Sequence, residues 1–152
     1  MRKDFYIFRH GETDYNKERR WQGCGLNPPL NETGVAQAKE LTGLLQDKDL
    51  QIIYSSPLKR ALQTAEIVNE TFRLPIEIIP DLREGCFGEA EGMLKTEIAQ
   101  KYPDIFEAWY NGEDDMDIGF PEGETKRQMQ ERMLGVLERL RDVPYQRIGI
   151  AS

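Results

Sequence analysis

Residues 4–13, DFYIFRHGET, join a short apolar run to a polar turn. The run over 4–8 predicts a buried first strand. Arg9 and His10 then stand at the carboxyl end of that strand, where open α/β sheets bind ligands. His10 is the only histidine in 152 residues, and a lone histidine is more often structural than catalytic. Its neighbours favour a function here, because Arg9 is a permanent cation and Gly11 lets the backbone approach a ligand closely.

The composition fits a single soluble globular domain over residues 1–152. Hydrophobic residues make up 39% of the chain and charged residues 31%, and the length suffices for a buried core. No apolar run approaches the roughly 18–20 residues that a bilayer-spanning helix needs. The net charge of −7 disfavours nucleic acid and anionic membranes as partners. A bound anion would therefore need a local basic pocket within an acidic protein.

The two cysteines, Cys24 and Cys86, belong to no Cys-x-x-Cys or zinc-like spacing. We expect both to be free thiols in a reducing compartment. The first strand begins within the first five residues, which leaves no room for a signal peptide. Together these features predict a cytoplasmic protein.

Hydrophobic periodicity and end signals predict three further strands and three long helices. Two shorter helices are expected within 95–111. Asn31 or Thr33 can cap the first long helix. The strands cover residues 50–54, 74–79 and 147–152, and the long helices cover about 31–47, 57–68 and 125–141.

Residues 55–60, SSPLKR, mark a second junction between a strand and a helix. Ser56 is a good N-cap, and Pro57 suits the first helical position. Arg60 then falls in the first turn, where acidic residues are usual and the positive end of the helix attracts anions. The residue is either a solvated surface arginine or a phosphate clamp, and the junction favours the clamp.

Both junctions resemble motifs of a known family. The RHGET block of residues 9–13 with Asn16, and the Ser-Ser-Pro-x-x-Arg-Ala pattern over 55–61, are similar to signatures of the histidine phosphatase superfamily, the phosphoglycerate mutase-like group. This resemblance implies an α/β fold in three layers, with helices on both sides of a mostly parallel central sheet. It also implies chemistry that requires no metal or other cofactor.

The resemblance assigns roles to individual residues of the two junctions. His10 is implied as the catalytic nucleophile, which becomes a phosphohistidine during turnover. Arg9, Asn16 and Arg60 are implied to bind the transferred phosphoryl group. Arginine suits this task because its planar guanidinium group can bind two oxygens at once.

Two other segments extend the resemblance. Residues 82–92 are similar to a Leu-x-Glu-x-x-Phe-Gly-x-x-Glu-Gly segment of the family, in which Glu84 falls on the position of the catalytic proton donor. The long loop over 9–30 has little periodicity, and such loops are usually functional. Gln22 and Gly23 within it resemble the family's substrate-facing loop and are implied to bind substrate.

Other residues of these segments are expected to be structural. Trp21 is predicted to be a hydrophobic plug beneath the loop. Glu89 and Glu91 are predicted to be solvated or capping carboxylates. The acidic segment within 111–124 is predicted to be a solvated flap rather than a metal site, and its acids are Glu113, Asp114, Asp115 and Asp117.

The last predicted strand stops at Ser152, where members of the family continue into His-Gly-Gly and so place a second histidine in the phosphate pocket. We therefore expect the sequence to be a fragment, truncated before that histidine. Loss of one preorganised donor typically costs roughly 10²–10³ in rate. Weakened or lost activity is the expectation for the sequence as it stands.

These features predict metal-independent hydrolysis of a small phosphorylated metabolite through a phosphohistidine intermediate. Two alternatives stay open at this point. One is a phosphoglycerate mutase, although the segment after Glu84 is shorter than in the glycolytic mutases. The other is a phosphate-binding regulatory module without turnover. The sequence identifies neither the substrate nor the oligomeric state. A homodimer is one option.

Overall fold

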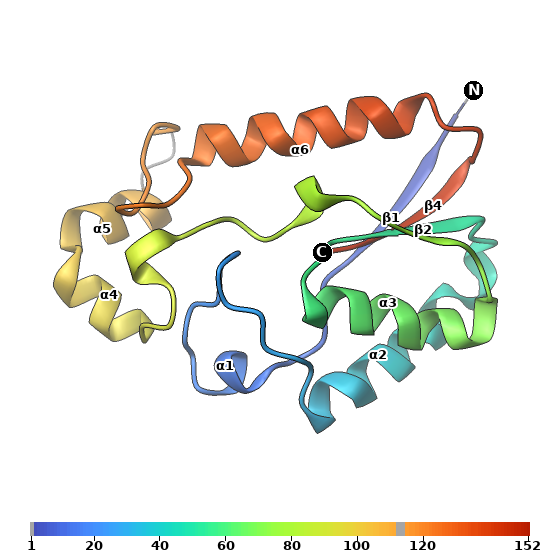
Figure 1. Ribbon diagram of the computed structural model, residues 1–152, viewed down its shortest axis with the longest axis horizontal. Helices are drawn as coiled ribbons and strands as arrows, with labels where there is room; N and C mark the ends of the chain where they lie inside the picture. Colours follow the sequence, from blue (N-terminus) through green and yellow to red (C-terminus); the bar gives the residue numbers. More distant parts are fainter. Residues whose placement is uncertain (1, 112–114) are drawn as a thin grey trace.

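The structure is a computed structural model that describes residues 2–111 and 115–152. Within these residues a four-stranded sheet forms the centre, with the strand order β1-β4-β2-β3 (Figure 1). All neighbouring strands run parallel. The strands are β1 (Asp4–Phe8), β2 (Ile52–Ser55), β3 (Ile76–Ile78) and β4 (Arg147–Ala151).

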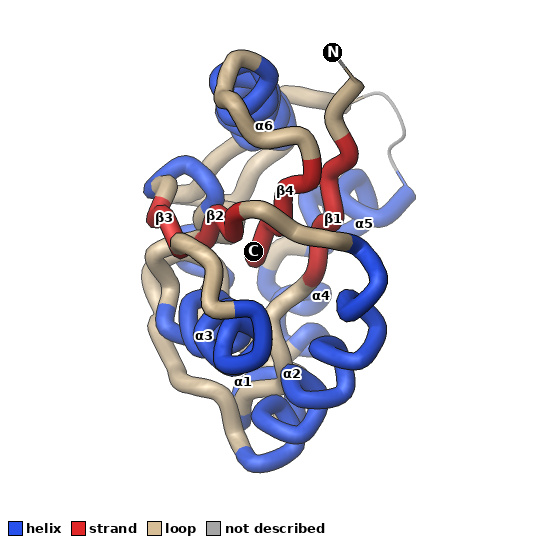
Figure 2. The backbone as a smooth tube through the Cα atoms, turned by 90° about the vertical axis from the view of Figure 1, so that its right-hand side faces the viewer, coloured by secondary structure: helices blue, strands red, loops and turns tan. Residues whose placement is uncertain are grey.

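Helices cover both faces of the sheet (Figure 2). α2 and α3 lie against one face, α6 lies over the other, and α1, α4 and α5 stand beyond the carboxyl end of the strands (Figure 1). No helix of the described ranges is both long and apolar enough to span a membrane. The helices are α1 (Asp14–Lys17), α2 (Glu32–Leu45), α3 (Lys59–Phe72), α4 (Lys95–Lys101), α5 (Pro103–Asn111) and α6 (Lys126–Arg141), with 3-10 turns η1 (Gln46–Lys48), η2 (Pro80–Leu82) and η3 (Gly88–Ala90).

Alternate side chains of the central strands enter two separate cores, because successive residues of a strand point to opposite faces. Ile53 packs with Phe8 of β1 and Val68 of α3 on one face. Ile52, its neighbour in β2, packs with Leu140 of α6 on the other face. The predicted three-layer α/β fold with a mostly parallel sheet is therefore confirmed.

The parallel register brings the carboxyl ends of three strands to one edge. Phe8 and Ser55 both lie opposite Ala151 of β4. The His10 N–H donates to the carbonyl oxygen of Ser152 at 3.0 Å. The polar residues that follow β1, β2 and β4 consequently meet at this edge.

The start of α3 differs from the sequence prediction. The helix begins at Lys59, with Leu58 as its N-cap, rather than at Pro57. The Ser56 hydroxyl accepts from the Leu58 N–H at 3.2 Å, so it closes a turn ahead of the helix instead of capping it. Arg60 is the second residue of α3 and lies in the first turn, as predicted.

The long loop after β1 contains a short helix, α1, which the sequence analysis did not predict. Thr13 caps it, and Asn16 completes a reciprocal capping box. The following helix, α2, is capped by Asn31, whose side chain accepts from the Gly34 N–H at 2.9 Å. Of the two caps considered, Thr33 is therefore the wrong one.

A third apolar cluster supports the loops beyond the sheet. Trp21 is partly buried in it, with ring centroids 4.8 Å from Phe87 and 5.4 Å from Phe120. The prediction that Trp21 plugs the underside of the loop is confirmed. It joins the loop after β1 to the segment between β3 and α4.

Part of the acidic segment lies outside the described residues. The predicted flap includes residues 112–114, which lie between the described ranges 2–111 and 115–152. Asp115 and Asp117 are exposed, in agreement with a solvated segment. Asp117 pairs with Arg127 of α6 at 2.7 Å.

Candidate active site

His10 is buried at the carboxyl end of β1, with its side chain held between backbone and cations. Its Nδ1 lies 2.7 Å from the Gly11 carbonyl oxygen, so Nδ1 carries the proton and donates. Its Nε2 keeps a lone pair, to which Arg60 Nε donates at 3.3 Å. Burial is the largest cause that lowers the pKa of His10, and the charges of Arg60 and Arg9 lower it further, against raising effects of the Gly11 carbonyl and Glu84. The ring is thus held neutral, with Nε2 as its unprotonated nitrogen.

Arg60 is a buried cation, with only 1% of its surface exposed. Besides the bond to His10, its Nη1 donates to the Leu26 carbonyl at 3.0 Å and its Nη2 to the Gly23 carbonyl at 2.8 Å. Three hydrogen bonds therefore fix the plane of the guanidinium group. The alternative of a solvated surface arginine is wrong.

Two cavities near the carboxyl end of β1 share Arg9 and Asn16 in their walls. The first, of about 140 Å³, is lined by His10, and the second, of about 210 Å³, is lined by Glu84. Arg60 contacts the His10 ring through its Nε. The cavity walls contain all the other predicted site residues, namely Arg9, His10, Asn16, Gln22, Gly23 and Glu84.

Gln22 and Gly23 are both tied into the scaffold of the site. The Thr13 hydroxyl donates to Gln22 Oε1 at 2.6 Å, and both side chains are buried. Gly23 has a φ of 60°, a backbone conformation that favours glycine, and its carbonyl receives Arg60. The contact of Gln22 and Gly23 with substrate stays a prediction. Gly23 also has a structural role that its motif did not predict, since its carbonyl holds Arg60.

Thr64 was missed by the sequence analysis, although it links the two strand-to-helix junctions. The Gly11 N–H donates to its buried hydroxyl at 3.0 Å, and that hydroxyl donates to the Arg60 carbonyl at 2.7 Å. The spacing was an available signal, because a residue four positions after Arg60 lies on the same face of a helix.

Glu91 was also missed as a part of the site's scaffold. Its carboxylate accepts the N–H groups of Cys24 at 3.1 Å, Gly25 at 3.0 Å and Phe87 at 3.0 Å. The prediction of a capping carboxylate is confirmed, and the loop that it caps is the one that holds Arg60. No local pattern connects Glu91 to residues 66 positions earlier. Glu89, in contrast, is exposed, as predicted.

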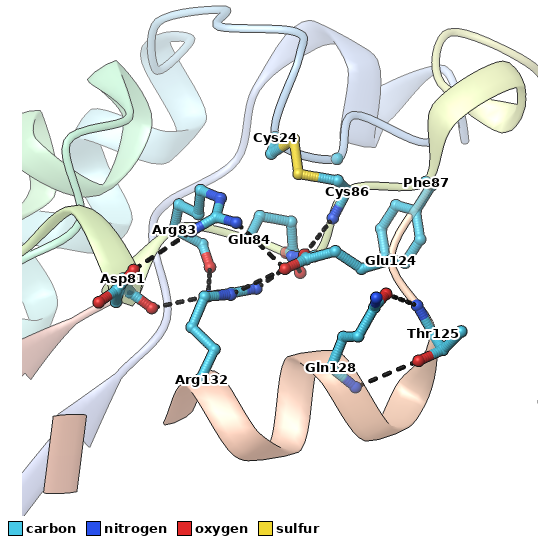
Figure 3. Close-up of polar contacts among 12 residues, drawn as sticks. Cys24, Asp81, Arg83, Glu84, Cys86, Phe87, Glu124, Thr125, Gln128 and Arg132 are labelled. Atoms are coloured by element: carbon cyan, nitrogen blue, oxygen red, sulfur yellow. Dashed lines mark hydrogen bonds and ion pairs between the residues drawn. A yellow bond between two sulfur atoms is a disulfide. The ribbon is translucent and has the colours of Figure 1, made fainter. Parts of the chain in front are cut away.

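The prediction that Cys24 and Cys86 are free thiols is wrong, because they form a disulfide (Figure 3). Their Cα atoms lie 4.7 Å apart, since the loop after β1 folds back against the segment that carries Glu84. The cysteines therefore give no support for a reducing compartment.

Across residues 2–111 and 115–152, no group of three or more His, Cys, Asp or Glu side chains is placed to hold a metal ion.

Comparison with known proteins assigns the chain to a family. The sequence model of the histidine phosphatase superfamily (branch 1) matches residues 5–152. The chain belongs to this superfamily. One relative is named as the uncharacterized phosphatase PhoE of Bacillus subtilis, 39% identical over 134 residues, which cover 88% of this chain and 62% of the relative. Another is phosphoserine phosphatase 1 of Hydrogenobacter thermophilus, 37% identical over 135 residues, which cover 89% of this chain and 63% of the relative. The chain thus spans about six-tenths of the length of these relatives.

Solved structures of the histidine phosphatase fold superpose well on the chain. The alpha-ribazole phosphatase of Shigella flexneri aligns with a TM-score of 0.84 and 32% identity, covering 97% of this chain and 72% of that one. YhfR of Bacillus stearothermophilus aligns with a TM-score of 0.85 and 33% identity, covering 97% of this chain and 73% of that one. The phosphoglycerate mutase-like fold inferred from the two junctions is confirmed.

Proposed function

We propose that the protein hydrolyses small phosphomonoesters through a phosphohistidine intermediate on His10. The observation that carries the proposal is the state of the ring: Nδ1 is bound to the Gly11 carbonyl, and Nε2 faces Arg60 with its lone pair. Such a nitrogen can attack phosphorus without first losing a proton. The relatives named as phosphatases support a phosphatase over a phosphate-binding module.

The first step transfers the phosphoryl group to the enzyme. His10 Nε2 forms a bond to phosphorus while the bond from phosphorus to the ester oxygen breaks, and Glu84 gives its carboxyl proton to the departing alkoxide. Arg9 and Arg60 stabilise the charge on the equatorial oxygens, with Asn16 as a neutral donor. Phosphoryl transfer needs little beyond such placement and charge stabilisation, and the two arginines supply that positive charge without a metal ion.

The second step returns the enzyme to its starting state. A water molecule enters the place of the leaving alcohol, and the Glu84 carboxylate takes one of its protons. The oxygen attacks phosphorus, the bond to Nε2 breaks, and inorganic phosphate leaves. Glu84 is protonated again for the next cycle, so the atoms and protons balance over one turnover.

The substrate is proposed to be a small metabolite. The two cavities that share Arg9 and Asn16 hold about 140 and 210 Å³, small volumes that suit a phosphoryl group and a compact leaving group. One relative is named as a phosphoserine phosphatase and one structural neighbour as an alpha-ribazole phosphatase, both of which are names of phosphomonoesterases.

The test is hydrolysis of p-nitrophenyl phosphate by the full-length protein, at mildly acidic pH and with EDTA present. We expect turnover that resists EDTA and disappears in His10→Ala. Rapid quenching should trap a phosphoramidate that is stable to alkali and labile to acid, and it should be absent from the variant. Turnover that persists in His10→Ala, or that EDTA abolishes, would contradict the proposal. Transfer of the trapped phosphate to a phosphoglycerate in preference to water would instead identify a mutase.

A further inference from the structure

The segment that carries Glu84 is fastened to α6 by a nearly buried ion pair, Glu124–Arg132 (Figure 3). The exposed fractions of the two side chains are only 15% and 10%. Arg132 Nε and Nη2 donate to the two carboxylate oxygens of Glu124 at 3.0 and 2.9 Å. This two-point geometry is stronger and more directional than a single contact between charges.

The ion pair forms hydrogen bonds with the backbone on both sides of Glu84. Arg132 Nη1 donates to the carbonyl of Arg83, the residue before Glu84, at 2.9 Å. Glu124 Oε2 accepts the N–H of Cys86, two residues after Glu84, at 2.9 Å. The Glu124 N–H donates in turn to the Cys86 carbonyl at 2.7 Å. The Glu84 carboxylate instead accepts the N–H of the next residue, Gly85. The ion pair therefore acts on the backbone around Glu84 and not on the Glu84 carboxyl group.

The pair is suited to stay ionised. Burial raises the pKa of Glu124, but hydrogen bonds from Arg132 and the Cys86 N–H, with the charges of Arg132 and Arg83, outweigh burial and lower it. A carboxylate whose pKa is lowered keeps its charge under the mildly acidic conditions of the proposed assay.

We propose that Glu124 and Arg132 are positioning residues, which set where the Glu84 carboxyl group meets the leaving-group oxygen. The inference rests on the proposed function, in which Glu84 supplies the proton that the alkoxide takes as its bond to phosphorus breaks. If the pair is lost, the proton donor is displaced while His10 and Arg60 keep their own hydrogen bonds. The defect should therefore grow as the leaving group becomes more basic.

The test compares two substrates that differ in their need for a proton. p-Nitrophenyl phosphate releases an acidic phenol that departs without help, whereas an alkyl phosphate releases an alkoxide that must be protonated. The ratio kcat/KM includes every step up to departure of the leaving group, so it isolates this difference. The full-length variants are Arg132→Met and Glu84→Gln, with Arg127→Met as the matched control, because Arg127 lies on the same helix but pairs with the exposed Asp117.

Misplacing a catalytic group by about 1 Å costs up to about 10²-fold, so we expect Arg132→Met to lower kcat/KM for the alkyl phosphate by about 10–100-fold and for p-nitrophenyl phosphate by less than about 3-fold. Glu84→Gln should show the same selective loss, and Arg127→Met should change neither value. Arg132→Lys should recover part of the lost rate, since a lysine can still donate to a carbonyl but cannot form the two-point pair.

Equal losses on both substrates, or no loss on either, in Arg132→Met would overturn the inference. The proposed function fails separately, if His10→Ala or Glu84→Gln retains the wild-type rate on the alkyl phosphate. Circular dichroism melting checks that each variant is folded. If Arg132→Met does not fold, Arg132→Lys and Glu124→Gln provide the same comparison between the two substrates.

Discussion

Arg60 Nε donates to His10 Nε2 at 3.3 Å, although 50 residues separate the two side chains in sequence. The contact arises because β1 and β2 both flank β4 in parallel, so the residues that follow them meet at one edge. In the proposed phosphohistidine, the phosphoryl group replaces this contact and lies beside a cation that the Gly23 and Leu26 carbonyls still hold in orientation. Such preorganised charge is usually the largest single contribution to catalysis of this kind.

The first prediction concerns that cation. Arg60→Lys keeps a positive charge, but a lysine cannot donate to the Gly23 and Leu26 carbonyls and to His10 from one rigid plane. We expect kcat for p-nitrophenyl phosphate to fall by about 10²–10³-fold. The exposed neighbour Lys59 provides the control, and Lys59→Met should keep the wild-type value. Wild-type turnover in Arg60→Lys would show that the fork geometry is unnecessary.

The second prediction concerns protonation of His10, whose pKa is lowered mainly by burial. As the only histidine in the sequence, it gives one resolvable imidazole Cε1–H signal in NMR. The folded protein should titrate below the value of about 6.5 found for the denatured chain. A depressed pKa stabilises the fold fully above that unfolded value and loses the contribution as pH falls through the folded value. The difference in unfolding free energy between wild type and His10→Ala should therefore shrink on acidification, and a folded pKa above 6.5 would contradict the prediction.

The third prediction separates two carboxylates that lie two positions apart. Glu91→Gln weakens two hydrogen bonds to the loop that holds Arg60 and one to the Phe87 N–H, whereas Glu89 is exposed and contacts Lys101 and Tyr102. We expect the inhibition constant of inorganic phosphate to rise about 10-fold in Glu91→Gln, because a displaced clamp costs binding. Glu89→Gln should leave it unchanged. Equal constants in the two variants would argue that Glu91 has no influence on the phosphate site.

The fourth prediction concerns the Cys24–Cys86 disulfide, which closes a loop with a sequence separation of 62. Loop-closure entropy assigns it a stabilisation of about 4 kcal/mol. Reduction by a dithiol, or replacement of both cysteines by serine, should lower the melting temperature. The serine variant should no longer respond to the reductant. Two thiols that react with a disulfide reagent in the native, unreduced protein would show that the bond does not form.

The fifth prediction pairs two glycines. A Cβ on Gly11 would lie 2.4 Å from the Gly34 carbonyl oxygen, so Gly11→Ala must push backbone apart next to His10. We expect a loss of about 1–3 kcal/mol in unfolding free energy. Gly43, in the exposed part of α2, has nothing within 4 Å of its Cβ position, and Gly43→Ala should add about 0.5–1 kcal/mol. Chemical denaturation measures both, and a tolerated Gly11→Ala would contradict the close approach.

Much of the site was predictable because many of its residues lie in short, contiguous motifs. The strand before His10 and the helix after Ser56 are local patterns, and each has its functional residue at a defined end. The boundary of α3 was misjudged by two residues because a serine hydroxyl can close a turn as well as cap a helix, and sequence does not separate these uses. The roles of Arg9, Asn16 and Glu84 stay predictions, although Arg9 and Asn16 line one cavity with His10 and a second cavity with Glu84.

The sequence by itself determined the alternation of strands and helices, the family, and the candidate residues at the ends of two strands. Those properties depend on neighbours within a few positions, where hydrophobic period and capping chemistry act. Only the tertiary structure decided that Cys24 meets Cys86, that Glu91 caps a distant loop, and that Glu124 and Arg132 hold the segment of Glu84. These contacts depend on which loops fold back over the carboxyl edge of the sheet. The packing of Trp21 with Phe87 and Phe120 is one such contact between distant segments, and no local pattern predicts it.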